Sequence, residues 1–81
     1  MKQYNHQNKD YKNSIEVVNA IEFMRYECMR YKISQARQAQ ELNCTPQNIS
    51  KLYRNRSFSL AQYIIIQNLI AEKRREEIER R

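Results

Sequence analysis

The chain contains no glycine and a single proline, Pro46. Loops that wrap the backbone around a phosphate require glycine, so the GxGxxG and P-loop nucleotide sites are excluded. One histidine and two distant cysteines are too few soft ligands for a zinc site. The sequence also places no Cys/His or Ser/His pair close together. We therefore expect neither an enzyme nor a bound cofactor.

The length of 81 residues supports one small domain. Residues 1–13 are polar and lack periodicity, which predicts a flexible tail preceding a folded domain over residues 14–81. The longest apolar run covers residues 64–66, far short of the roughly 20 residues that span a membrane. The N-terminus has no apolar stretch typical of a signal peptide, and two reduced cysteines suit the cytoplasm. We expect a cytoplasmic protein that does not enter a membrane.

Four helices are predicted, and each follows a serine or threonine that can act as its N-cap. Ser14 precedes a helix that ends near Tyr31, and Ser34 precedes a short helix that ends near Leu42. Thr45 precedes a helix over residues 46–54, and Ser59 precedes a long helix over residues 60–81. The sequence thus predicts an all-α bundle of four or five helices with a long C-terminal helix. The first helix carries an apolar stripe suited to burial: Val17, Val18, Ile21, Met24, Cys28 and Tyr31.

The two middle helices have polar outer faces. In the first, we expect Ala36, Ala39 and Leu42 to point inward, and Gln35, Arg37, Gln38 and Gln40 to point elsewhere. Asn43 is suited to the left-handed turn that follows. In the second, Pro46 takes the first helical position, and Ile49 and Leu52 point inward. At 100° per residue, the opposite face carries Gln47, Lys51 and Arg54, flanked by Asn48 and Ser50.

The net charge of +6 is concentrated in the middle of the chain. Residues 28–58 contain six basic residues and one acidic residue, Glu41, and residues 42–71 contain no acidic residue. Such a surface suits a polyanionic partner, although solubility alone also explains a modest excess of basic residues.

Residues 33–52 resemble the helix-turn-helix of the phage-repressor/Cro family, also called the XRE type. The resemblance is carried by Ser34-Gln35 at the start of the first motif helix, Ala39 between the helices, Cys44 after the turn, and Ile49 and Leu52 in the recognition helix. It departs from the family at Asn43, where glycine is usual, and at Tyr53 and Asn55, where glutamate and glycine often occur. The resemblance implies a lambda-repressor-like fold and a sequence-specific transcriptional regulator, a repressor of a phage or mobile element.

By position, the resemblance also implies which residues contact double-stranded DNA. The recognition helix over residues 46–54 would enter the major groove. Base contacts would come from Gln47, Asn48 and Lys51. Backbone contacts would come from Gln35, Arg37, Ser50, Arg54 and Arg56.

The last helix carries two apolar stripes, although one suffices to join its own core. Leu60, Ile64, Ala71 and Ile78 form one, and the second, broader stripe includes Tyr63 together with Ile65, Ile66, Leu69 and Ile70. Because one motif of this kind contacts few base pairs, we expect a homodimer. We assign the dimer interface to Ile65, Ile66, Leu69 and Ile70, although the pattern alone leaves open which stripe faces the partner.

Two other functions remain open. A helix-turn-helix protein-interaction module, of the antitoxin or inhibitor type, would bind a protein with weak salt dependence. Non-specific nucleic-acid binding would show steep salt dependence without sequence preference. The sequence indicates no small-molecule ligand.

Overall fold

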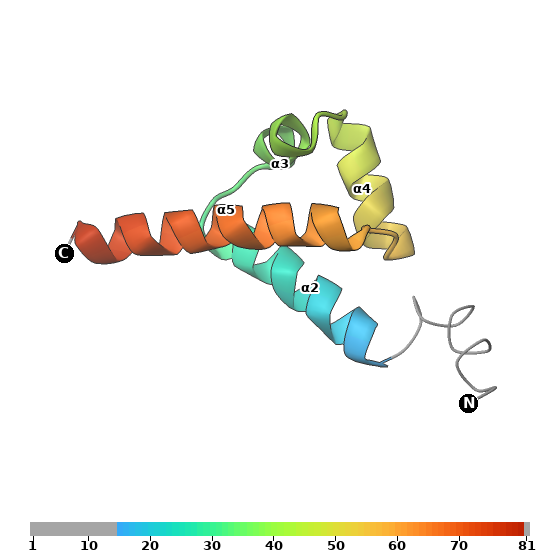
Figure 1. The fold of residues 1–81 in the computed structure, drawn as a ribbon, viewed down its shortest axis with the longest axis horizontal. Coiled ribbons are helices and arrows are strands. Elements are labelled where there is room, and N and C mark those ends of the chain that lie inside the picture. The colour runs from blue at the N-terminus through green and yellow to red at the C-terminus, as the bar shows by residue number, and fades with distance from the viewer. Residues whose placement is uncertain (1–14, 81) are drawn as a thin grey trace.

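The computed structural model describes residues 15–80, which form four helices and no strand (Figure 1). They are α2 (Ile15–Arg30), α3 (Gln35–Leu42), α4 (Pro46–Asn55) and α5 (Leu60–Glu79). The predicted all-α bundle with a long C-terminal helix is confirmed. Residues 60–79 form one continuous helix rather than two. The expected tail over residues 1–13, and Ser14 as a cap, lie outside the described residues.

Three of the helices begin at the predicted caps. The Ser34 hydroxyl accepts a hydrogen bond from the backbone of Arg37, and Thr45 caps α4 in the same way. Ser59 forms a reciprocal capping box with Gln62 at the start of α5. Such caps each stabilise a helix by about 1 kcal/mol. They fix where each of these helices starts.

Without glycine, other residues must adopt the left-handed turn conformation. Asn43 does so after α3 with φ 59°, as expected. Lys32 and Arg56 do so after α2 and α4, with φ values of 59° and 49°. A left-handed conformation costs roughly 1–2 kcal/mol for a residue with a Cβ atom, and asparagine tolerates it better than lysine or arginine. The turn before α3, at Lys32, and the turn after α4, at Arg56, are therefore strained.

The core lies between the four helices, and both α2 and α3 pack against α4 and α5 (Figure 1). Its members are fully or nearly fully buried: Ile21, Met24, Cys28, Ile33, Ala39, Ile49, Tyr53, Ile66, Leu69 and Ile70. Within residues 15–80, no helix is long and apolar enough to cross a membrane.

Two expectations for the face of α3 are wrong. Ala36 is exposed, whereas Gln38 is buried. The cause is a hydrogen-bonding partner on another helix: Tyr53 of α4 donates to the Gln38 amide and draws that side chain inward.

The prediction of the dimer interface on α5 is also largely wrong. Ile66, Leu69 and Ile70 lie in the core of the monomer, so they cannot face a partner. Of the four residues assigned to the interface, Ile65 alone is exposed. The broad stripe is the one that joins the core, against α2 and α3, because it offers the larger apolar area to bury. The other stripe is therefore the one left at the surface.

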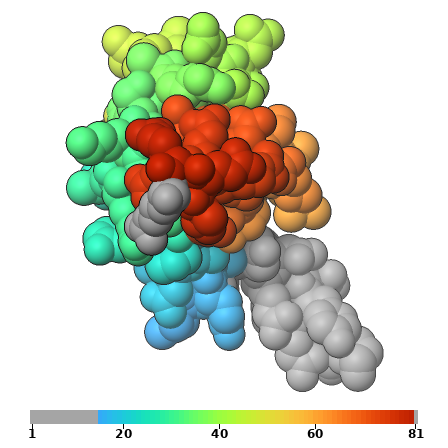
Figure 2. Space-filling view, turned by 90° about the vertical axis from the view of Figure 1, so that its left-hand side faces the viewer, coloured from blue at the N-terminus to red at the C-terminus, as the bar shows by residue number. Residues whose placement is uncertain are grey.

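The second half of α5 extends beyond the other helices (Figure 1). Figure 2 looks from the C-terminal end of α5 and shows α3 above this helix and α2 below it. One contact ties the extending half to α2: Arg74 Nη2 lies 3.2 and 3.0 Å from the two carboxylate oxygens of Glu27. The Arg74 guanidinium also lies over the ring of Tyr31, 5.8 Å from its centre. This contact fixes the direction of the helix after its buried residues end.

Candidate nucleic-acid interface

Helix α4 has one buried face and one polar face. Ile49 and Tyr53 are buried against the core, whereas the predicted base-contacting residues Gln47, Asn48 and Lys51 are exposed. Arg54 is also exposed, in the last turn. The structure therefore brings amide and cationic side chains together on the outer side of one short helix.

The orientation of α4 is fixed by a buried chain of polar contacts. The Tyr53 hydroxyl donates to Gln38 Oε1 at 2.6 Å, and Gln38 Nε2 donates to the backbone carbonyl of Ile33 at 3.1 Å. Cys28 Sγ lies 3.7 Å from the same hydroxyl. The Phe58 ring packs edge-on against Tyr53, with ring centres 4.9 Å apart. These contacts join α2, α3 and α4 behind the polar face.

Burial sets the protonation state of this chain. It raises the pKa of the Tyr53 hydroxyl far above its usual value of 10.0, and the Cys28 side chain adds to the effect. Burial also raises the pKa of the Cys28 thiol above 9.0. Both groups are neutral at physiological pH, and a buried neutral thiol is unreactive. Cys28 and Cys44 are both free cysteines, as expected.

A surface hydrogen bond links the two helices of the motif. Ser50 Oγ donates to Gln35 Oε1 at 3.0 Å, which joins the middle of α4 to the first residue of α3. The bond uses the oxygen of the Gln35 amide, so its NH2 group is the part suited to a phosphate oxygen. Two residues predicted to contact the DNA backbone thus position each other.

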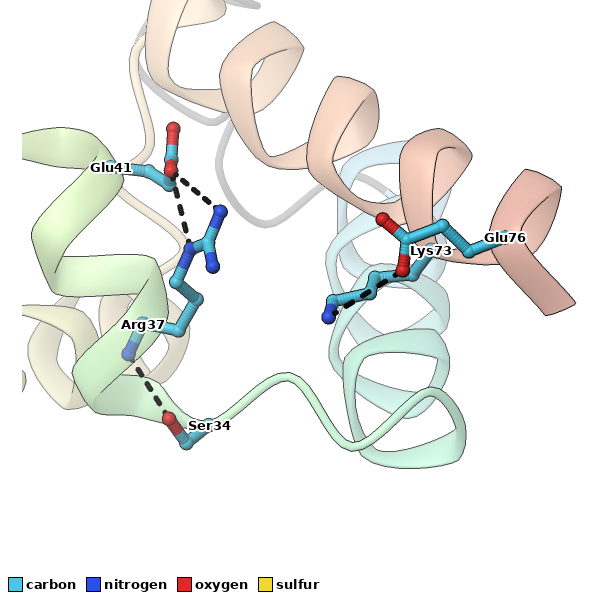
Figure 3. A network of polar contacts seen from close by, with 5 residues as sticks. All are labelled: Ser34, Arg37, Glu41, Lys73 and Glu76. Carbon is cyan, nitrogen blue, oxygen red and sulfur yellow. Dashed lines mark hydrogen bonds and ion pairs between the residues drawn. The ribbon is translucent and has the colours of Figure 1, made fainter.

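Arg37 is committed to a contact within its own helix. Its Nε and Nη2 atoms lie 3.2 and 3.1 Å from Glu41 Oε2, as Figure 3 shows. The carboxylate offsets the charge that a phosphate would use. Arg37 is therefore a weaker candidate for a backbone contact than Arg54.

Arg56 occupies the C-cap of α4, where its backbone N–H bonds to the last turn of the helix. Its side chain is half-buried. Arg56 therefore terminates α4 in addition to carrying a charge near it.

Two basic residues that the sequence analysis did not assign lie beside the start of α3. Arg25 and Lys32 line an open cleft of about 420 Å³ together with Ser34 and Gln35. Helical periodicity could not show this pairing, because α2 ends at Arg30 and Lys32 lies in the left-handed turn that follows. Arg25 and Lys32 add positive charge next to the exposed N–H groups of α3.

Among residues 15–80, no group of histidine, cysteine, aspartate or glutamate side chains could hold a metal ion. No family model, curated protein or solved structure matches the chain.

Proposed function

We propose that this protein is a sequence-specific double-stranded DNA-binding regulator of the phage-repressor/Cro type, which acts in the cytoplasm as a homodimer. The main support for this proposal is that α4 has one buried apolar face and one exposed polar face. Its buried face, held by Tyr53, leaves Gln47, Asn48 and Lys51 outward on a rigid helix. Rigid placement of base-reading side chains is what sequence discrimination requires.

The chemistry of these side chains fits base edges in the major groove. Glutamine and asparagine amides pair with adenine through one donor and one acceptor, and lysine donates to guanine. Each such contact is worth about 1–3 kcal/mol of discrimination. No acidic residue lies in residues 42–71 to repel the DNA.

Phosphate contacts would flank this helix on both sides. Gln35, Arg25 and Lys32 gather at the start of α3, and Arg54 lies at the end of α4. The N-terminus of a helix attracts phosphate through its unpaired N–H groups, which strengthens the first of these positions. The DNA would then be held beside the middle of the recognition helix and at its end.

Fluorescence anisotropy tests the proposal, with duplexes selected from a random pool and a shuffled control, across a range of salt. We expect Lys51→Ala to reduce the preference for the selected duplex by about 1–3 kcal/mol. Lys32→Ala should weaken both duplexes equally and reduce the salt slope by about one. Arg75→Ala, an exposed arginine on α5, is the matched control and should change neither.

A different observation favours the protein-interaction alternative. α2 exposes Phe23, Tyr26 and Met29 on the side away from the core, each with more than half of its surface accessible. A face of this kind is typical of protein docking. Under this alternative, neither duplex binds at low salt, and Phe23→Glu abolishes capture of a protein partner while Lys51→Ala has no effect.

A further inference from the structure

Helix α5 presents a second apolar stripe that the monomer does not use. Leu60, Ile64 and Ile78 are 74%, 47% and 63% exposed, and Ala71 lies between them on the same face. Ile64, Ala71 and Ile78 are seven residues apart, the heptad spacing at which helices pair along a seam. The stripe is opposite the buried face, so it points away from the molecule.

The surface around this stripe lacks charge over half of the helix. Residues 57–71 contain no charged side chain in a chain that is 30% charged. A helix face that remains in water normally carries charged residues. The absence of charge indicates a face that becomes covered.

We propose that a second copy of this chain covers the stripe, with the two α5 helices antiparallel. The two helices would be related by a twofold axis near Leu69. Leu60 then lies level with the partner's Ile78, and Ala71 lies level with the partner's Gln67. Leu60 and Ile78 thus meet at the two ends, Ile64 lies level with the partner's Arg74, and the small Ala71 permits close approach in the middle.

The charge distribution of α5 determines the direction of pairing. Its first turn contains no acidic residue and its last turn no basic residue, so neither end of the helix dipole is balanced by its own side chains. Antiparallel pairing places Glu79 level with Ser59 at the start of the partner's helix, where negative charge is stabilising. Parallel pairing would instead place Glu76 and Glu77 beside the same residues of the partner, and Arg74 beside the partner's Arg74.

The pairing also specifies the DNA site, a step that rests on the proposed function. α5 has 20 residues, a length of about 30 Å. α4 joins the start of α5 through residues 56–59, so antiparallel pairing holds the two recognition helices near opposite ends of the pair. The successive major grooves on one side of a duplex are about 34 Å apart. α3 and α4 lie on one side of α5, so one duplex can meet both copies (Figure 1). We therefore expect an inverted repeat with half-site centres about 10 base pairs apart.

Sedimentation without DNA tests the pairing independently of DNA binding. At about 100 µM protein, the wild-type chain should be a dimer, because association depends on concentration. Ile64→Arg places a positive charge level with the partner's Arg74, so it should be a monomer with unchanged helical circular dichroism. Phe23→Arg is the matched control on the exposed face of α2 and should remain a dimer. A monomeric wild type, or a dimer that Phe23→Arg dissociates and Ile64→Arg does not, would overturn the proposal.

Cross-linking tests the direction of pairing. In a Cys44→Ser background, the double variant Leu60→Cys/Ile78→Cys should oxidise to a covalent dimer linked between positions 60 and 78. Neither single variant should cross-link. A covalent dimer of Leu60→Cys alone would show parallel pairing and contradict the inference. If the antiparallel dimer forms but binds no DNA, the proposed function fails and this pairing stands. If Lys51-dependent DNA recognition occurs in a strict monomer, the pairing and the proposed homodimer fail, whereas DNA recognition by α4 stands.

Discussion

The α3–α4 unit and the second half of α5 are stabilised in different ways. The unit is fixed by two N-caps, left-handed turns at Asn43 and Arg56, and the buried bond from Tyr53 to Gln38. From residue 71 to residue 79, α5 has exposed side chains apart from the half-buried Lys73, and this part is held to α2 by Arg74. Its own ion pair, between Lys73 and Glu76, spans 3.9 Å and adds little.

The two regions differ in the contacts that order them. The α3–α4 unit is ordered within one chain, which suits a helix that must present fixed side chains to a rigid duplex. The end of α5 has few internal contacts and an exposed apolar stripe, which suits a helix that gains its order from a second copy. Substitutions in the two regions should therefore differ in their effects.

Truncating a core residue of α4 should cost far more than the same change on the exposed stripe of α5. Ile49 is fully buried, so Ile49→Ala should lower the free energy of unfolding by about 2–5 kcal/mol. Ile78→Ala should change the monomer by less than about 0.5 kcal/mol. Urea denaturation at low protein concentration measures both. Equal losses would contradict the contrast between the two regions.

Removing one hydroxyl should destabilise the α3–α4 unit. Tyr53→Phe leaves the buried oxygen of Gln38 without its donor, which should cost about 1–3 kcal/mol. Tyr26→Phe is the matched control, because Tyr26 is exposed on α2. If thermal denaturation shows the same midpoint for the two variants, the buried chain does not hold α4.

The same buried chain predicts a loss of stability in alkali. Burial raises the folded pKa of Cys28 above 9.0, so above that pH the unfolded chain releases a proton that the folded chain keeps. Stability is therefore full below pH 9 and falls as the pH rises, by up to about 1.4 kcal/mol per pH unit for one group. Tyr53 adds to the fall above pH 10. Denaturation from pH 8 to pH 10.5 should show a shallower fall for Cys28→Ala, and an unchanged slope would exclude Cys28 as the cause.

The smallest effect concerns the strained turn before α3. Lys32→Gly relieves a left-handed backbone and should raise the free energy of unfolding by up to about 1 kcal/mol, less the entropy that glycine adds to the unfolded chain. The same change should weaken DNA binding, because it removes a cation from the cleft beside α3. Asn43→Gly, at a position that already tolerates the conformation, should change stability less. A variant that is stabilised with unchanged DNA affinity would exclude Lys32 as a phosphate contact.

Local features of the sequence predicted most of the fold. Ser34, Thr45 and Ser59 marked the starts of three helices, because capping is a short-range interaction that the sequence displays directly. Helical periodicity also placed Gln47 and Lys51 on the outer face of α4. These features depend on residues within one turn of one another.

Side-chain burial and contacts that depend on residues far apart in the sequence could not be predicted from local patterns. Gln38 is buried because of Tyr53, which is 15 residues away and forms its bond only in the fold. The two stripes of α5 are both apolar, so periodicity alone could not decide which one joins the core. Arg25 and Lys32 come together with Gln35 only once the chain turns at Lys32.

The most direct test of sequence recognition by α4 is the affinity of the wild-type chain for a selected duplex relative to its shuffled control, at physiological salt. We expect a preference of about 1,000-fold or more for the selected duplex, typical of specific regulators, which Lys51→Ala reduces and Arg75→Ala does not. Equal affinity for the two duplexes would contradict sequence recognition by α4. If neither duplex binds at low salt, the polar face of α4 is not a DNA-binding surface.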